Sequence, residues 1–166
     1  ITGRLKSSWL TIEGEKEKSI IKSLAYSASG QKLCEEHGNG VLTTYTYEPQ
    51  TQRLIGIKTE RLLSHAVNAK VLQDLRYEYD PVGNVVKVTN DAEATRFWRN
   101  QKIVPENTYI YDSLYQLIAA TGRETANISR QINPFLFSIS PQPSDDSVYT
   151  NYKRTYHYDL GGNLTQ

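Results

Sequence analysis

The chain has 166 residues, of which 38% are hydrophobic and 22% are charged, and its 19 basic and 18 acidic side chains give a formal net charge of +1. This balance provides no basic field for nucleic acid, and no apolar run is long enough to span a membrane. The only cysteine, Cys34, excludes an internal disulfide and a cysteine-rich metal site, so we expect no metal and no cofactor. Because the chain contains no methionine and stops inside its last predicted hairpin, we expect it to be an internal piece of a longer protein.

The N-terminal part predicts strands over residues 9–12 and 19–26, separated by a charged turn at 13–18. A first hairpin unit is expected near residues 20–35, where Tyr26 is followed by S-A-S-G-Q-K-L. In this degenerate copy we place the hydrophobic end of the motif at Leu33. The interval from Tyr26 to Leu33 is then one residue longer than the corresponding interval in the clearest copy of the motif, near residues 71–90.

The second hairpin unit is expected near residues 44–59 and contains the sequence YTYE, with Tyr45 and Tyr47 two positions apart. Alternate residues of a strand point to the same face, so such a pair makes one face of the strand aromatic. The following residues, 60–75, fit either a helix or one long strand. We favour a strand from Val71 onward, with a loop or a single helical turn before it.

The third unit, near residues 71–90, is the clearest copy of the motif: Tyr77 and Tyr79 are followed by Asp80, a proline, a valine and Gly83. Asp at the first, Pro at the second and Gly at the fourth position is typical of a type I turn. Gly83 can adopt the positive φ that a three-residue hairpin loop needs. A β-branched run over 85–89 then predicts the return strand.

After this hairpin, Arg96, Arg99 and Lys102 surround Phe97 and Trp98. Interleaved arginines and aromatics can stack nucleic-acid bases. For so short a run we favour the simpler interpretation, in which a solvated face alternates with a buried aromatic face.

The fourth unit, near residues 103–121, contains Tyr109, Tyr111 and Asp112, but Tyr115 stands where the glycine belongs. A tyrosine at positive φ is disfavoured, so we expect a different turn type here. Residues 125–151 have the proline- and serine-rich composition of a long loop. Within that loop, Phe135 and Phe137 are candidate partner contacts, although local packing against the sheet is the simpler expectation.

The last unit, near residues 152–166, contains Tyr156, Tyr158, Asp159 and Gly162. The spacing between successive second tyrosines is uneven, which indicates a constant hairpin with excursions of variable length. The sequence therefore predicts an all-β chain of successive antiparallel hairpins that form one twisted sheet strip. The edge strands of such a strip could cause the fragment to associate with itself.

Catalytic chemistry has no support in the sequence. The three histidines are scattered, and neither Cys34 nor any serine stands in a motif with a base or an oxyanion hole. Asp80, Asp112 and Asp159 begin turns, where an Asp side chain caps the backbone, so we assign them structural roles. We expect a protein that is not an enzyme.

The units YEYDPVGNV and YHYDLGGNL resemble the tyrosine-aspartate repeats of Rhs-type proteins, whose general form is Y-x-Y-D-x-x-G-x-L. The stretch from Leu72 to Glu124, with runs such as TRFWRNQ and YDSLYQL, resembles more particularly the C component of bacterial ABC-type insecticidal toxin complexes. The resemblance covers the chain from about Tyr26 to its end.

This resemblance implies a fragment of a larger β-shell, which a B-like component and the C component close around a cytotoxic polypeptide. The expected partners are the rest of the shell, the B-like component and the enclosed toxin polypeptide, without nucleic acid or a membrane span. The parent protein would be secreted or associated with the cell surface. Tyrosine-aspartate repeats also occur on surface proteins, so carbohydrate binding or cell adhesion is the alternative function.

Overall fold

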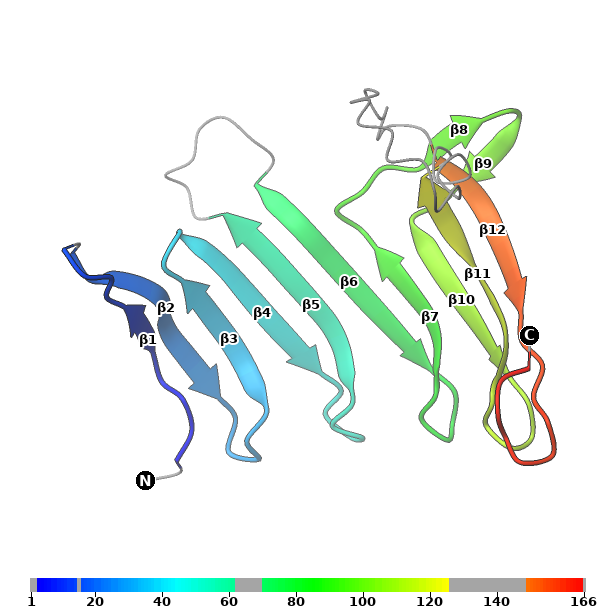
Figure 1. The fold of residues 1–166 in the computed structure, drawn as a ribbon, viewed down its shortest axis with the longest axis horizontal. Coiled ribbons are helices and arrows are strands. Elements are labelled where there is room, and N and C mark those ends of the chain that lie inside the picture. The colour runs from blue at the N-terminus through cyan, green and yellow to red at the C-terminus, as the bar shows by residue number, and fades with distance from the viewer. Residues whose placement is uncertain (1–2, 15, 62–69, 126–148, 166) are drawn as a thin grey trace. The chain divides into compact units, whose positions relative to one another are not determined.

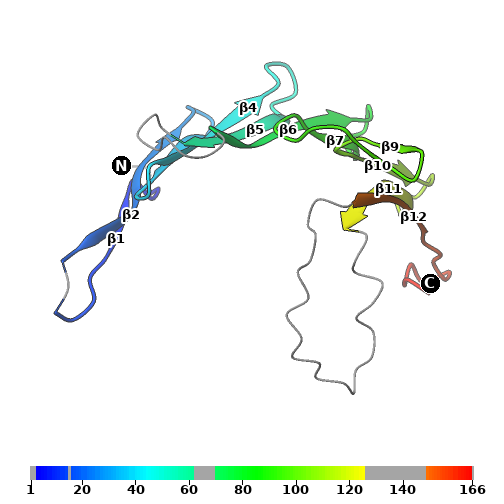
Figure 2. The same ribbon diagram turned by 90° about the horizontal axis from the view of Figure 1, so that it is seen from above.

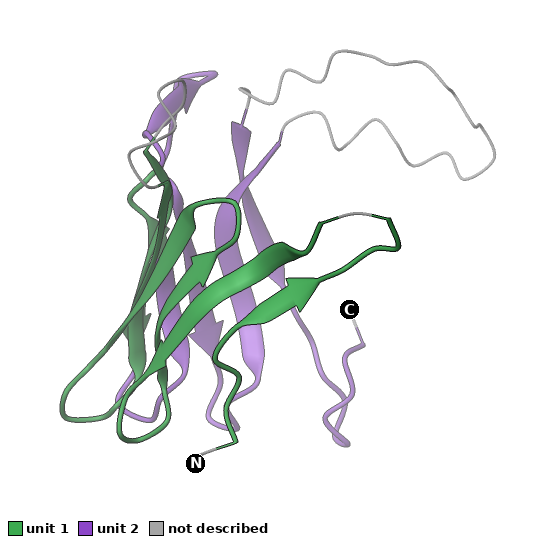
Figure 3. Ribbon diagram, turned by 90° about the vertical axis from the view of Figure 1, so that its left-hand side faces the viewer, with its two compact units in different colours: residues 1–78, 89–92 green, residues 79–88, 93–166 purple. Residues whose placement is uncertain are grey.

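The computed structural model describes residues 3–14, 16–61, 70–125 and 149–165, and the regular structure in this part of the chain consists of β-strands alone. The all-β prediction is therefore confirmed. The chain divides into two compact units, which Figure 3 shows in different colours. Unit 1 comprises residues 1–78 and 89–92, and unit 2 comprises residues 79–88 and 93–166.

Unit 1 is an antiparallel meander in which every strand pairs with its neighbours in sequence (Figure 1). Its strands are β1 (Ser8–Leu10), β2 (Lys18–Tyr26), β3 (Lys32–His37), β4 (Val41–Tyr47), β5 (Leu54–Arg61) and β6 (Val71–Tyr79, of which residues 71–78 belong to unit 1). β6 begins at Val71, as the strand interpretation predicted. The expected loop or helical turn before it falls mostly on residues 62–69, which lie outside the described residues.

In unit 2 the main strands follow the order β7, β10, β11, β12, and β8 pairs separately with β9. These strands are β7 (Val85–Asn90, of which residues 85–88 belong to unit 2), β8 (Arg96–Trp98), β9 (Gln101–Ile103), β10 (Glu106–Tyr111), β11 (Leu117–Thr125) and β12 (Tyr149–Thr155). A bridge between Tyr158 and Leu164 closes the last turn. Of the predicted loop over 125–151, residues 126–148 lie outside the described residues, whereas residues 149–151 belong to β12 because they pair with β11.

Tyrosines occupy one face of the strands, which we call the tyrosine face in each unit. In unit 1, Tyr45 pairs with Ile57, which pairs with Leu75 on the next strand. In unit 2, Tyr109 pairs with Ala120, which pairs with Arg154. Paired residues share a face, so each row lies on the same side of its sheet.

Each unit is a single layer of strands when it is seen edge-on in Figure 2. Among the described residues, the buried hydrophobic side chains are Ile103, with 0% of its surface exposed, and Ala120, with 4%. The tyrosines of the Y-x-Y pairs are half-buried, because neighbouring strands cover only their sides, whereas Glu78, between Tyr77 and Tyr79, is exposed. The sheets thus hold together through edge-to-edge pairing and side-chain rows instead of a closed core.

The prediction of a buried aromatic face around Phe97 was wrong. Phe97 and Trp98 are exposed over 74% and 40% of their surfaces, respectively. The reason is that β8 and β9 form a two-stranded sheet of their own, separate from the larger sheet (Figure 1), and Phe97 and Trp98 stay largely exposed in it.

Candidate functional site

The aspartate of each Tyr-Asp copy accepts hydrogen bonds from the backbone of its own turn. Asp80 Oδ1 accepts from the amides of Gly83 at 2.7 Å and Asn84 at 2.8 Å. Asp159 and Asp112 repeat this pattern, because each accepts from the amide four residues later, at 2.8 and 2.9 Å respectively. Such bonds satisfy turn amides that would otherwise need water.

The turns with and without glycine at this position of the motif have the same geometry. Gly83 and Gly162 have φ values of 120° and 81°, and Tyr115, at the same place in its copy, has a φ of 62°. In addition, Asp112 N donates to Gln116 O and Tyr115 N donates to Asp112 O, as in the glycine-containing turns. The expectation of another turn type at Tyr115 was therefore wrong, since the capping and strand pairing around it hold the tyrosine in the left-handed region.

The first copy also has the short turn, contrary to the longer interval assigned to it from Leu33. Ser27 N donates to Gln31 O, and Gly30, with a φ of 93°, donates to Ser27 O. The return strand thus starts at Lys32. Among these turns, the YTYE turn alone is longer by one residue, because Glu48 N donates to Arg53 O, five residues later.

The second tyrosine of a copy binds the hairpin that precedes it. The phenol of Tyr47 donates to Lys32 O at 3.0 Å, that of Tyr111 to Val85 O at 2.9 Å, and that of Tyr158 to Leu117 O at 2.9 Å. In all three cases the acceptor stands six residues after the preceding second tyrosine, namely Tyr26, Tyr79 and Tyr111. We call this contact the tyrosine latch. It fastens successive hairpins by side chains in addition to the strand pairing.

Another recurring position was missed by the sequence reasoning. Five residues after the second tyrosine, every copy has an amide side chain: Gln31, Gln52, Asn84, Gln116 and Asn163. The asparagines bind the aspartate of their own turn, Asn84 at 2.8 Å and Asn163 at 3.0 Å. The longer Gln31 instead reaches the neighbouring turn and donates to Gln52 O at 2.7 Å. An alignment of the five copies would have revealed this position, whereas the latch has no signal within one copy.

Several of these groups have shifted pKa values. The hydrogen bond from the Asn84 side chain lowers the pKa of Asp80, and that from Asn163 lowers the pKa of Asp159. Burial raises the pKa of Tyr77 and Tyr111. These directions keep the turn aspartates charged and the tyrosines neutral, which are the states that their hydrogen bonds require.

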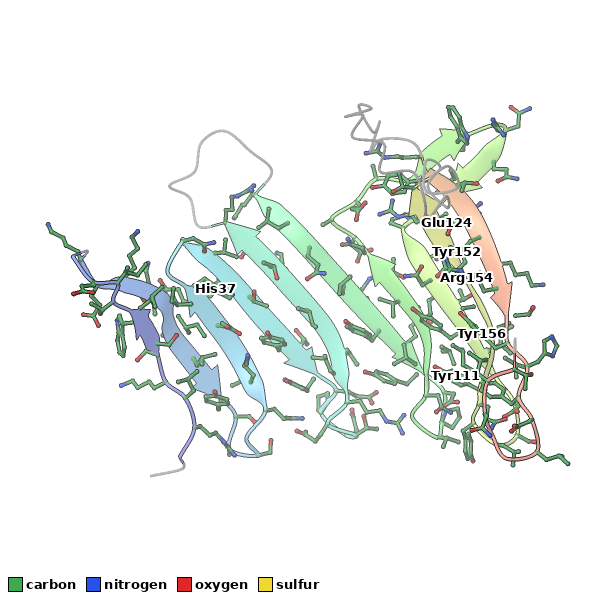
Figure 4. All side chains as sticks on the ribbon, viewed as in Figure 1. His37, Tyr111, Glu124, Tyr152, Arg154 and Tyr156 are labelled. Atoms are coloured by element: carbon green, nitrogen blue, oxygen red, sulfur yellow. The ribbon has the colours of Figure 1, made fainter. Side chains whose placement is uncertain are left out.

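Polar clusters on the tyrosine face are internally paired. In unit 1, Lys32 Nζ lies 2.7 Å from the buried Glu35, and this hydrogen bond raises the pKa of Lys32. In unit 2, Arg154 lies 3.0 Å from Glu124 and stacks 4.7 Å from the ring of Tyr152, three residues that Figure 4 labels along β11 and β12. Such mutual pairing is typical of structural contacts.

We find no candidate catalytic or metal-binding centre in the part of the chain that the structure describes. Those residues contain no group of three potential metal ligands and no helix long and apolar enough to span a membrane. His157 is exposed, and His37 lies 3.9 Å from Glu35. Phe135 and Phe137, the candidate partner contacts, lie outside the described residues.

No family model matches the chain, but individual proteins are similar to it. The toxin subunits YenC2 and YenC1 of Yersinia entomophaga are 68% and 66% identical to it, over 99% and 100% of this chain. The chain spans 17% of the length of each of these relatives.

Solved structures agree with the sequence comparison. A crystal structure of TcdB2-TccC3 has a TM-score of 0.77 at 66% identity, and the match covers 98% of this chain and 8% of that chain. The Tc holotoxin pore of Photorhabdus luminescens has the same TM-score at 68% identity, over 98% of this chain and 7% of that chain. Over nearly its whole length, therefore, the chain is homologous to one segment of the toxin subunits of Tc complexes, and it shares the antiparallel β-sheet fold of that segment.

Proposed function

We propose that the chain is a wall segment of an Rhs-type β-repeat shell that encloses a cytotoxic C-terminal polypeptide in an extracellular insecticidal toxin complex. Its partners would be the rest of the shell, a B-like component and the enclosed polypeptide. The observation that carries this proposal is the tyrosine latch, which at Tyr47, Tyr111 and Tyr158 fastens a hairpin to the one before it. A wall of single-layer sheet needs such fastening because it has no second layer to pack on.

The wall role assigns structural functions to the residues of the repeat. The capped turns would fix the register of each hairpin, the latches would join hairpins, and the variable excursions would leave this framework unchanged. In unit 1 and unit 2 alike, the charged side chains of the described ion pairs neutralise one another. This arrangement supports a scaffold role, since the charged side chains of these described ion pairs are engaged with one another.

Protease protection tests this function. The full-length subunit, assembled with its B-like partner, is treated with trypsin, and survival of the C-terminal polypeptide is followed by mass spectrometry. We expect this polypeptide to survive in the assembled subunit and to be digested once the shell is unfolded in denaturant. Digestion at the same rate in both states would contradict enclosure.

A further inference from the structure

The hairpin formed by β8 and β9 is anchored at its base and exposed at its tip. Ile103 is fully buried, Asn151 Nδ2 donates to Lys102 O at 3.1 Å, and the guanidinium of Arg96 lies 5.4 Å from the ring of Tyr149. Beyond this base, Phe97 and the residues of the tip are exposed. The hairpin is therefore a fixed projection of unit 2.

The tip of the hairpin has an unfavourable backbone for its sequence. Trp98 pairs with Gln101, so Arg99 and Asn100 form a two-residue loop, and their φ values of 49° and 61° are those of a type I′ turn. Asparagine and glycine are favoured in such loops, whereas a left-handed arginine costs about 1–2 kcal/mol. A strained residue that persists at an exposed tip points to a role outside the fold.

Composition identifies the class of partner. Residues 96–103 include three basic side chains and no acidic one, in a chain whose net charge is only +1. In the part of the chain that the structure describes, neither Arg99 nor Lys102 forms an ion pair. The guanidinium of Arg99 lies 5.8 Å from the ring of Trp98, so cation and aromatic surface face a partner together. Arginine and tryptophan are the residues most enriched in binding hot spots.

From these observations we infer that the β8–β9 hairpin docks into an acidic, partly apolar recess on the folded B-like component of the same toxin complex. Carboxylates of that recess pair with Arg99 and Lys102, while Phe97 and Trp98, which point to opposite faces of β8, contact apolar walls on either side of the inserted hairpin. A folded partner is favoured over an extended polypeptide because the hairpin is already held at its base before it binds. This inference rests on the proposed function, since it assigns a contact surface to the wall.

The test compares charge reversal at the tip with charge reversal elsewhere in unit 2. The full-length subunit carrying R99E and K102E is titrated with its B-like partner component at low and high salt, and K153E on β12, whose side chain is exposed, is the matched control. We expect the tip variant to weaken binding at least ~10-fold at low salt and to lose the salt dependence, and Trp98→Ala to weaken it by a similar factor. The control should bind as the unmodified subunit does.

A photo-crosslinking amino acid at Phe97 provides a second readout without charge reversal. Crosslinks to an acidic region of the partner component support the inference. Crosslinks that form only within the subunit or with the enclosed polypeptide would overturn it. Tip variants that bind the partner component as K153E does would overturn it as well. So would tip variants that lose binding to duplex DNA while their binding to the partner component is unchanged. Trypsin protection of the enclosed polypeptide is measured on the same samples. If the polypeptide is protected and the tip variants bind the partner component normally, the docking site alone is refuted. If the polypeptide is not protected in the unmodified subunit, the proposed wall function is refuted.

Discussion

The two tyrosines of one copy differ in what their phenol groups bind. Tyr158 donates to Leu117 O at 2.9 Å, whereas in the part of the chain that the structure describes the hydroxyl of Tyr156 has no hydrogen bond. Both residues are half-buried. Within this copy, Tyr158 therefore forms the latch and Tyr156 is its matched control.

Tyr158→Phe should loosen the last hairpin, and Tyr156→Phe should not. Loss of one phenol bond costs about 1 kcal/mol, so we expect ~5-fold faster amide exchange around β11. Hydrogen exchange of the full-length protein, read by mass spectrometry, provides the comparison. Equal exchange in the two variants would show that the latch is not a stabilising contact.

The glycine position of the turn offers a stabilising change. Tyr115→Gly removes the cost of a left-handed tyrosine, about 1–2 kcal/mol, and loses little burial because Tyr115 is exposed. Leu114→Gly at the neighbouring position, which has no positive φ, should lower stability instead. Slower amide exchange over 112–116 in the first variant alone is the expected result.

Acid should open the aspartate turns selectively. The pKa values of Asp80 and Asp159 are lowered in the folded state, so their stabilisation is complete above the unfolded pKa and disappears as the pH falls through the folded pKa. The turn at residues 27–31 has no carboxylate and serves as the internal control. If amide exchange at 80–84 and at 27–31 changed equally with pH, the caps would contribute nothing.

At the scale of the element, close packing distinguishes the glycines of the strands. A Cβ at Gly122 would lie 2.0 Å from Asn107 Oδ1 and 2.8 Å from the hydroxyl of Tyr152, whereas at Gly56 the nearest atom is at an ordinary 3.5 Å. Gly122→Ala should therefore displace the side chains of Asn107 on β10 and Tyr152 on β12 and cost about 1 kcal/mol. Gly56→Ala should be neutral or stabilising. Hydrogen exchange of each strand pair measures both effects, and a tolerated Gly122→Ala would contradict the packing.

The strands themselves could be predicted because the Tyr pairs and β-branched runs alternate with period two, as at β6 and β7. The turn at Tyr115 could not, since local preference opposed the conformation that Asp112 and the strand pairing impose. The exposed Phe97 was missed because alternation predicts which side chains share a face but not whether anything covers that face. The tyrosine latch could not be predicted because it joins residues of different copies.

At the scale of the whole molecule, little apolar surface is buried within the described part of either unit. The isolated 166-residue chain should consequently associate or unfold without cooperativity, because edge strands such as β12 have unpaired backbone groups. Sedimentation velocity should show concentration-dependent association. A stable monomer with a sharp thermal transition would mean that the wall segment is a self-sufficient domain.

A single-layer wall must have one face toward the enclosed polypeptide and the other away from it. Tyr109 and Ile110 are neighbours in β10 that point to opposite faces, and Ile110 is exposed. The most direct measurement places a photo-crosslinking amino acid at either position in the full-length assembled subunit. We predict crosslinks to the C-terminal polypeptide from one position and none from the other; crosslinks from both or from neither would contradict a wall that encloses it.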